Sequence, residues 1–291
     1  MNTNTEPHGL LINKRIEQII NDMIMQECQK ANHLSCGKGN PPVCVEKVKQ
    51  SFDNYRQNDI YPDFSNKSMS MGYICGYLGL HYYQMLFGMK NVVSDLNSVD
   101  NRRLRICDVG CGPGTASLAF IQSVMLSDKW KGYDFEVTLI DPSKILLNSA
   151  KVLVNDCMEH FKINGCMEII EGKYSLDYLF NNQFDFIAFS NVLAPLSKAK
   201  DGLSDFVAEF NKYKKTLRAN PVVMFAEPHS YSNAKNLVLE IHSQFLNQGL
   251  IRCKLIQMEK TEGFPIPIFY KSLSKKNLRL RPTGVYLYIR L

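Results

Sequence analysis

The sequence predicts an α/β fold in which a helical N-terminal segment precedes a doubly wound, mostly parallel sheet of seven strands. From Arg103 onward, apolar strand-like runs alternate with amphipathic helical stretches, which is typical of a parallel sheet covered on both faces. A glycine-rich run joins the first strand to the next helix. The first hundred residues instead show helical periodicity without a reaction motif. We therefore predict a helical cap or lid over residues 1–100 and an α/β domain over residues 101–291.

Three helices are expected in the N-terminal segment. Apolar residues between Ile12 and Ile24 repeat at helical spacing, a second helix is expected after Pro41-Pro42, and a third covers about Ser70–Val93. The uncharged stretch Ser68–Met89 is too rich in tyrosine, glycine and other polar residues to span a bilayer. These helices are expected to pack as a cap over the α/β domain, and no membrane partner is predicted.

The α/β part is expected to contain five parallel strands, helices between them and a final pair of strands. Phe184–Ser190 is almost continuously apolar, which suits a central strand covered on both faces. The predicted strands are 104–108, 137–140, 166–171, 184–190 and 221–226, followed by the strand-like runs 250–257 and 285–291. The predicted helices are 143–164, a helix that Asp201 caps and that reaches Leu217, and a helix from Ala234 to Gly249.

The run Leu104–Thr115 carries the clearest functional motif. An apolar strand leads into Asp108, and glycines then follow at the alternate positions 110, 112 and 114. Glycine lets the backbone bend tightly and approach a ligand more closely than a residue with a Cβ permits. A helix is expected to begin near Thr115. This pattern is typical of a loop that binds a nucleotide cofactor.

A second acidic residue follows the next predicted strand. Asp141 comes directly after Val137–Ile140, and Pro142 behind it suits the first turn of a helix. A carboxylate at this place can bind the two hydroxyls of a ribose. Nicotinamide enzymes use similar geometry, but their fingerprint is G-x-G-x-x-G, whereas the glycines here follow G-x-G-x-G. The spacing therefore disfavours a nicotinamide oxidoreductase.

Together with Asp108, the glycine spacing resembles motif I of the class I S-adenosylmethionine-dependent methyltransferases, and Asp141 matches the ribose-binding acid of that family. The final strand pair, with one strand antiparallel, is also similar to the end of that family's sheet, so the resemblance covers residues 103–291. It implies S-adenosylmethionine as cofactor. The implied cofactor-binding residues are Asp108, Gly110, Cys111, Gly112, Gly114, Asp141, Pro142, Tyr174, Ser190 and Asn191. The family often has an adenine-binding acid after strand three. Glu171–Asp177 lacks an acid at the expected place, so Tyr174, Leu176 and backbone groups are the expected adenine contacts.

Methyl transfer from a sulfonium depends mainly on in-line positioning of the acceptor. The candidate catalytic residues are Asn191, at a strand end, and Glu227 and His229, which follow strand five and could act as general bases. Alternatively, Glu227 holds a loop and His229 is a surface residue. The segment Ser190–Pro195 departs from the Asn/Asp-Pro-Pro-aromatic and Pro-Cys motifs of nucleic-acid methyltransferases.

A second, partial resemblance concerns Ala226–Ala234 and Phe189–Leu193, which are similar to the mitochondrial small-subunit ribosome-assembly methyltransferase-like family. In that family a cysteine cluster that binds an iron-sulfur centre follows the Glu-Pro strand, whereas only Cys253 lies beyond it here. The net charge of +6 includes a basic segment, 271–290, that could meet phosphate. Both observations make RNA a possible partner.

The nine cysteines form no Cys-x-x-Cys pair, so free thiols in a reducing compartment are expected. Cys28, Cys36 and Cys44, with His33 between them, match no familiar ligand spacing, and no metal site is predicted. No secretory signal is visible, and a cytoplasmic location is expected. The favoured acceptor is a small molecule, because the aromatic segment Tyr73–Phe87 suits a planar or apolar compound. An RNA methyltransferase and a non-catalytic assembly scaffold are the alternatives.

Overall fold

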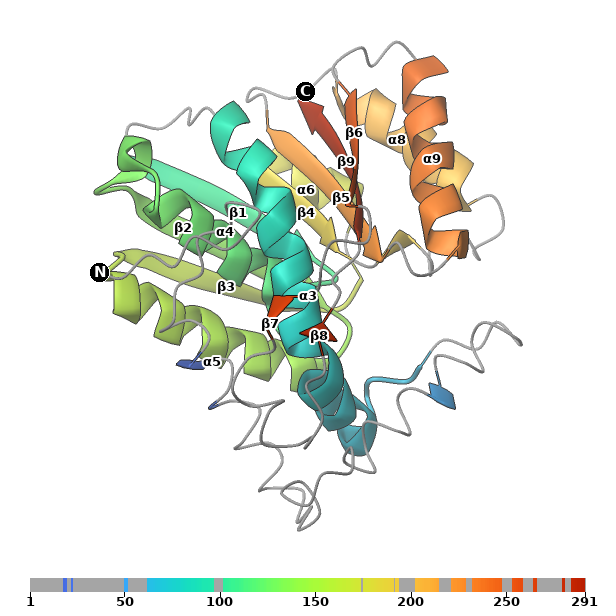
Figure 1. Cartoon of the computed structure of the whole chain (residues 1–291). Coiled ribbons are helices and arrows are strands. Elements are labelled where there is room, and N and C mark those ends of the chain that lie inside the picture. The colour runs from blue at the N-terminus through green and yellow to red at the C-terminus, as the bar shows by residue number, and fades with distance from the viewer. Residues whose placement is uncertain are drawn as a thin grey trace.

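The centre of the molecule is a seven-stranded sheet in the order β3-β2-β1-β4-β5-β9-β6 (Figure 1). This computed structural model describes residues 62–96, 102–173, 175–190, 192–193, 202–214, 221–228, 232–247, 253–258, 264–265, 279–280 and 284–290, together with 18–19, 22 and 50–51. The strands of the sheet are β1 (Arg103–Val109), β2 (Asp134–Asp141), β3 (Gly165–Glu171), β4 (Phe186–Ser190), β5 (Val222–Pro228), β6 (Cys253–Met258) and β9 (Gly284–Arg290).

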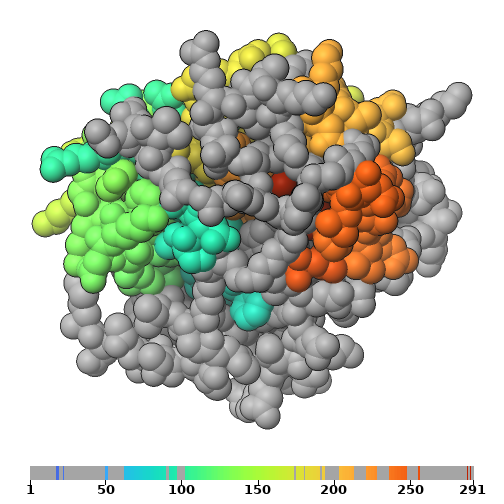
Figure 2. All heavy atoms as spheres, turned by 90° about the horizontal axis from the view of Figure 1, so that it is seen from above, coloured from blue at the N-terminus to red at the C-terminus, as the bar shows by residue number. Residues whose placement is uncertain are grey.

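Helices connect most of these strands. They are α3 (Lys67–Asp95), α4 (Thr115–Met125), α5 (Lys144–Phe161), α6 (Leu176–Asn181), α8 (Gly202–Lys214) and α9 (Ser232–Asn247), with a short 3-10 turn at Asp128–Trp130. Two short strands, β7 (Phe264–Pro265) and β8 (Arg279–Leu280), pair with each other outside the sheet. In the view from above, α3 in teal lies between the green segments around α4 and the orange helix α9 (Figure 2).

The pairing of the strands confirms the predicted fold class. Strands β1 to β5 form parallel pairs, and β9 runs antiparallel to both β5 and β6. The strand order reverses at β1, which has β2 on one side and β4 on the other. In open α/β sheets, ligands bind outside the carboxyl ends of the strands at such a switch point. The loops after β1 and β4 are therefore the expected walls of a site.

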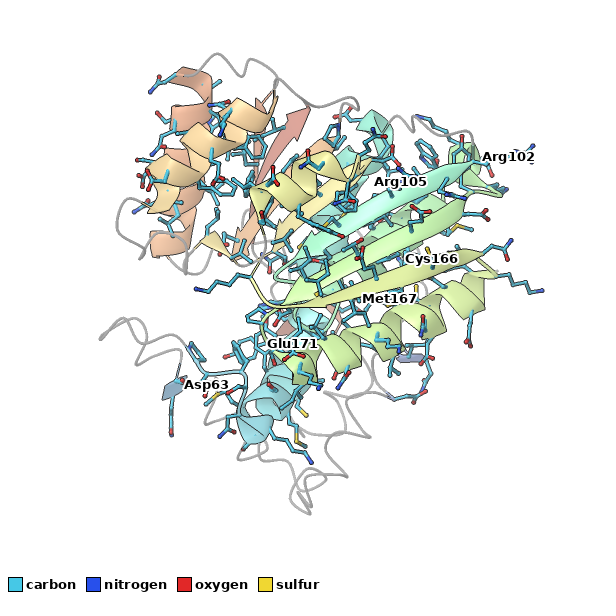
Figure 3. The ribbon with its side chains drawn as sticks, turned by 180° about the vertical axis from the view of Figure 1, so that it is seen from behind. Asp63, Arg102, Arg105, Cys166, Met167 and Glu171 are labelled. Carbon is cyan, nitrogen blue, oxygen red and sulfur yellow. The ribbon has the colours of Figure 1, made fainter. Side chains whose placement is uncertain are left out.

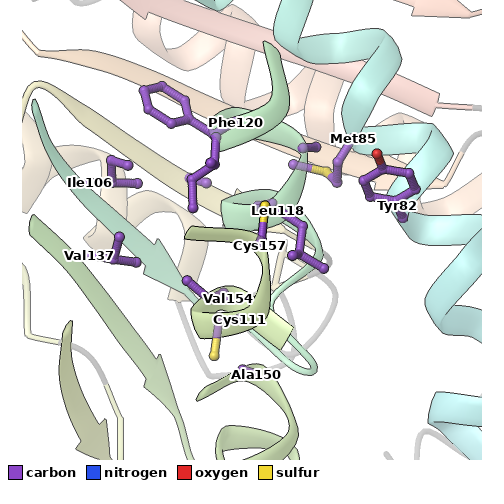
Figure 4. Packing of buried hydrophobic residues seen from close by; sticks show 14 of the residues in the cluster. Tyr82, Met85, Ile106, Cys111, Leu118, Phe120, Val137, Ala150, Val154 and Cys157 are labelled. Atoms are coloured by element: carbon purple, nitrogen blue, oxygen red, sulfur yellow. The ribbon is translucent and has the colours of Figure 1, made fainter. Parts of the chain in front are cut away.

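Two hydrophobic clusters cover the two faces of the sheet, because successive side chains of a strand point to opposite faces. In β4, Phe186 and Ala188 belong to the cluster formed with α3, α4 and α5, whereas Ile187 and Phe189 belong to the cluster formed with α6, α8 and α9. Figure 4 shows part of the first cluster, with Phe120 of α4 beside Ile106 of β1. All five residues of β4 are buried, as predicted for a central strand.

Some predicted element boundaries were wrong. Strand β5 extends to Pro228, so Glu227 lies inside the strand and does not follow it. Helix α5 begins at Lys144 with Ser143 as its N-cap, so Pro142 precedes the helix and is exposed. Of the two predicted helices before residue 62, the structure describes only Gln18, Ile19 and Asp22 in the first and Gln50 and Ser51 in the second, and these residues are helical. The predicted helix-terminal residues Asp201, Leu217 and Gly249 lie outside the described residues. Within the described part of the chain, none of the helices has the length and apolarity needed to cross a bilayer.

Candidate functional site at the carboxyl ends of the strands

The loop between β1 and α4 has a backbone that only glycine adopts readily. Gly110, Gly112 and Gly114 have φ angles of +64°, +52° and +82°, in the left-handed region that disfavours L side chains. A Cβ on Gly114 would also lie 3.2 Å from the Cβ and 3.3 Å from the Cα of Ala150 in α5. The glycines therefore let the loop turn sharply and let α4 begin, as predicted, at Thr115 directly against α5.

Asp141 joins the end of β2 to this loop. Its Oδ2 accepts a hydrogen bond from the Gly112 N–H at 2.9 Å, and its Oδ1 accepts one from the Ser143 N–H at 2.7 Å. The side chain is 7% exposed, and burial raises the pKa of its carboxyl group. A carboxylate has about four acceptor positions on its two oxygens. Two positions therefore remain for a ligand beside the glycine loop.

Asp108 holds the start of α4 from below the loop. Its Oδ2 accepts hydrogen bonds from the Ser117 N–H at 3.0 Å and from the Ser117 Oγ–H at 2.9 Å. The side chain is completely buried, and burial raises the pKa of the carboxyl group to about 7. Its Oδ1 has no hydrogen-bond partner within the described part of the protein. One buried acceptor thus remains unsatisfied beside the loop.

The segment after β4, which includes Val192 and Leu193, forms a wall across from the glycine loop. Ser190 is buried at the end of β4, with its Oγ 3.6 Å from the sulfur of Met85 in α3. The Val192 side chain lies on Gly110, because a Cβ added to Gly110 would be 2.1 Å from the Val192 Cγ1. The loops after β1 and β4 are therefore in direct contact at the switch point.

Glu227 holds this wall from β5. Its Oε1 accepts a hydrogen bond from the Leu193 N–H at 2.8 Å, and the Val192 N–H is a second backbone donor to the carboxyl group. The side chain is 2% exposed. Burial raises the pKa of Glu227 to about 8, against the opposing effect of the two N–H groups. The observed contacts of Glu227 are thus with the backbone of a loop.

The N-terminal end of α3 covers the glycine loop and the end of β2. The Tyr73 ring comes within 3.7 Å of the position that a Cβ of Gly112 would occupy. The Phe64 carbonyl accepts a hydrogen bond from the Oγ–H of Ser143, two residues after Asp141, at 2.6 Å. The Tyr73 hydroxyl lies 2.9 Å from His81 Nδ1, and burial lowers the pKa of His81 to about 4, so this imidazole is neutral near pH 7.

The structure brings most of the described candidate residues to one edge of the sheet. Gly110, Gly112, Gly114 and Asp141 are linked as above, and Ser190 lies across from Gly110, where its carbonyl oxygen is 3.7 Å from the position of a Cβ. Cys111 donates its N–H to the Ile140 carbonyl at 3.0 Å. Pro142 is exposed next to Asp141. Tyr174, Asn191 and His229 lie outside the described residues, as do Lys271, Lys275, Lys276 and Arg281 of the basic segment.

Sequence reasoning missed three residues that shape this edge. Ser143 caps α5 and contacts both Asp141 and Phe64, and the Asp-Pro-Ser turn before a helical run was a usable signal for it. Ser117 binds Asp108 from inside α4, and Val192 packs on Gly110. No local pattern indicates these last two contacts, because both depend on how separate strands meet.

Two cysteines, Cys107 and Cys111, flank the glycine loop. Cys107 and Cys111 are buried, and burial raises the pKa of both thiols, which disfavours the nucleophilic thiolate. The residues that the structure describes include no group of three His, Cys, Asp or Glu side chains placed to hold a metal ion. Cys28, His33, Cys36 and Cys44 fall outside them.

A scan against models of protein families finds no match, and a comparison with curated proteins finds none either. Among solved structures, the chain is similar to the METTL16 methyltransferase domain, with 12% identity over 84% of this chain and 95% of that chain and a TM-score of 0.45. It is also similar to a human methyltransferase 10 domain containing protein, with 12% identity over 84% of this chain and 97% of that chain and a TM-score of 0.43. Because both TM-scores are below 0.5, the fold assignment rests on the strand order and register described above.

Proposed function

We propose that the protein is an S-adenosylmethionine-dependent methyltransferase. The observation that carries this proposal is the hydrogen bond between the Asp141 carboxylate and the Gly112 N–H. It joins an acid at the end of β2 to a glycine loop with three left-handed residues, beside the switch point of the sheet. A nucleoside with a charged tail requires both features within one crevice, because its ribose hydroxyls need acceptors and its tail needs close backbone approach.

The residues of the site fit this cofactor. The two acceptor positions left on Asp141 match the two hydroxyls of a ribose. The bound cofactor would supply an electrophilic methyl group on a sulfonium. Tyr174 and Leu176 remain the proposed adenine contacts, and Asn191 is proposed to lie near the acceptor.

We further propose a small molecule as the methyl acceptor, with residues 1–100 as a cap over the site. Support comes from the aromatic side chains that α3 and its preceding turn place beside the glycine loop. The rings of Phe64 and Tyr73 are 4.9 Å apart, and Tyr73 stacks with Tyr77 at 5.6 Å. Flat aromatic surfaces beside a few polar groups are typical of small-molecule sites.

Calorimetric titration with S-adenosylhomocysteine tests the cofactor assignment. We expect saturable binding to the wild type and at least about tenfold weaker binding to Asp141→Ala, because the substitution removes hydrogen bonds to a charged acceptor. Asp134→Ala is the matched control, since Asp134 lies at the amino end of β2, whereas Asp141 lies at its carboxyl end. Its affinity should equal that of the wild type. A folded wild type that binds no S-adenosylhomocysteine would contradict the proposal.

Labelled cofactor then tests the acceptor. Transfer of the methyl group to planar small molecules, and not to RNA, is the expected result. Transfer to RNA that weakens steeply with salt would assign an RNA acceptor. Cofactor binding without transfer to any member of either class would favour an assembly scaffold.

A further inference from the structure

We propose that Glu227 is a positioning residue of the cofactor site. Glu227 holds the segment after β4 as a wall against the glycine loop and does not touch the cofactor. This inference rests on the proposed function. The sequence suggested Glu227 as a general base, whereas this inference gives it a structural role behind the segment after β4. Two contacts that lead from Glu227 to Gly110 support it, together with the direction of the Glu227 side chain.

The first contact is between Glu227 and the backbone of the wall. The Leu193 N–H donates to Glu227 Oε1 at 2.8 Å, and the Val192 N–H also donates to this carboxyl group. A residue after a strand end has no ladder partner for its N–H, so these donors need an acceptor when they are buried. Glu227 supplies that acceptor from the neighbouring strand.

The second contact is between the wall and the glycine loop. A Cβ on Gly110 would lie 2.1 Å from Val192 Cγ1, so the Val192 side chain occupies the space that any other residue at position 110 would need. A shift of Val192 therefore moves the surface against which Gly110 turns. Because Gly112, which Asp141 contacts, lies only two residues further on, such a shift reaches the proposed ribose site.

The third observation is the direction of the Glu227 side chain. Val223 and Phe225 of β5 belong to the hydrophobic cluster on the side of α8 and α9, and alternation along the strand places Glu227 on the same face. Leu193, whose N–H it accepts, belongs to that cluster as well. With 2% of its surface exposed, Glu227 is enclosed behind the wall. This position suits support of the wall better than proton transfer with an acceptor.

Glu227→Gln tests the proposal because it keeps the shape of the side chain. The titrations are run above pH 8, where Glu227 is ionised, and the amide then offers one acceptor oxygen to the Leu193 and Val192 N–H groups where the carboxylate offers two. We expect the affinity for S-adenosylhomocysteine to fall about tenfold or more. Asp185→Asn is the matched control: Asp185 is a buried acid on the same face of the sheet that accepts the Arg105 N–H at 2.8 Å, but at the amino ends of the strands. Its affinity should not change.

A double-mutant cycle separates positioning from a general loss of stability. Val192→Ala leaves the bonds of Glu227 intact and removes the contact with Gly110, so it should also weaken binding. Its effect should be non-additive with Glu227→Gln and additive with Asp185→Asn. If Glu227→Gln does not fold, Val192→Ala alone decides, and unchanged affinity would overturn the proposal. Unchanged affinity of folded Glu227→Gln, with or without loss of methyl transfer, would overturn it too. Failure of the wild type to bind would instead reject the proposed function.

Discussion

The two ends of the same sheet use buried carboxyl groups in different ways. At the amino ends, Asp185 accepts the Arg105 N–H at 2.8 Å while its own N–H donates to the Arg105 carbonyl at 2.9 Å, so the acid extends the pairing of β4 with β1. At the carboxyl ends, Glu227, Asp141 and Asp108 accept N–H groups of segments outside their own strands. The same interaction stabilises strand register at one end and positions loops at the other. Figure 3 marks the two ends with Arg105 and Glu171.

The packing around glycines also differs between the two ends of the sheet. Gly114 and Gly132 have almost equal φ angles, +82° and +79°. A Cβ on Gly114 would press against α5, whereas a Cβ on Gly132, in the turn before β2, meets nothing within 4 Å. Backbone conformation alone demands glycine at the amino end, and both conformation and close packing demand it at the carboxyl end.

The largest expected effect is that of Gly114→Ala compared with Gly132→Ala. A left-handed residue with a Cβ costs roughly 1–2 kcal/mol, and overpacking adds roughly 1–3 kcal/mol. We therefore expect the free energy of unfolding to fall by about 2–5 kcal/mol for Gly114→Ala and by about 1–2 kcal/mol for Gly132→Ala, measured by urea unfolding. Equal losses would show that the contact with α5 is not tight.

An intermediate effect concerns pH. The pKa values of Asp108 and Glu227 are raised by burial to about 7 and about 8, so the native protein keeps these protons over a range in which the unfolded chain, with pKa values near 4, has lost them. Through these two groups the free energy of unfolding falls as pH rises from about 4 to about 8, whereas His81, with its pKa lowered to about 4, contributes a rise with pH up to about 6.5. The slope per group is at most about 1.4 kcal/mol per pH unit.

Urea unfolding between pH 5 and pH 8.5 measures this slope for the wild type, Asp108→Asn and Glu227→Gln. Each substitution removes one of the two titrating groups and should flatten the decline, and Asp108→Asn should do so mainly below pH 7. A decline that is the same in all three proteins would show that neither group retains its proton in the native state.

The smallest effect is expected from an ion pair at the amino end. Arg103 Nη1 lies 2.8 Å from Glu136 Oε1, but the two side chains are 45% and 33% exposed, and Arg105 also pairs with Glu136. Exposed pairs contribute about 0–1 kcal/mol. Arg103→Ala should therefore lower the free energy of unfolding by less than about 1 kcal/mol and leave the affinity for S-adenosylhomocysteine unchanged. A loss of affinity would mean that the two ends of the sheet are coupled.

The sequence predicted the fold well because its signals are local. The strand cores of β1 to β5, the start of α4 at Thr115 and the antiparallel final strand all follow from apolar runs, glycines and turn residues within a few positions. The boundary errors at Glu227 and Pro142 have different causes. Glu227 stays in β5 because it pairs with Val285 of β9, a partner far away in the sequence. Ser143, and not Pro142, is the cap because its Oγ accepts the Leu146 N–H.

The site was less predictable than the fold. The motif indicated Asp141 and the three glycines, but the partner of the Asp141 carboxylate, the Gly112 N–H, depends on the spacing of two strands. The contact of Val192 with Gly110 and that of Glu227 with Leu193 each join loops or strands that lie far apart in the sequence. Such contacts depend on the complete sheet, and no short sequence pattern records them.

The position of β9 has a consequence for how the chain is synthesised. This strand lies between β5 and β6, although it follows both in the sequence. Roughly 60 residues separate the end of β5 from the end of β9, which at about 5–20 residues per second corresponds to several seconds of translation. During that interval the apolar strand β5, with its backbone groups unpaired on one side, is an exposed edge open to wrong partners. A nascent chain stalled before Gly284 should therefore bind chaperones or aggregate, and release of the last strand should end both.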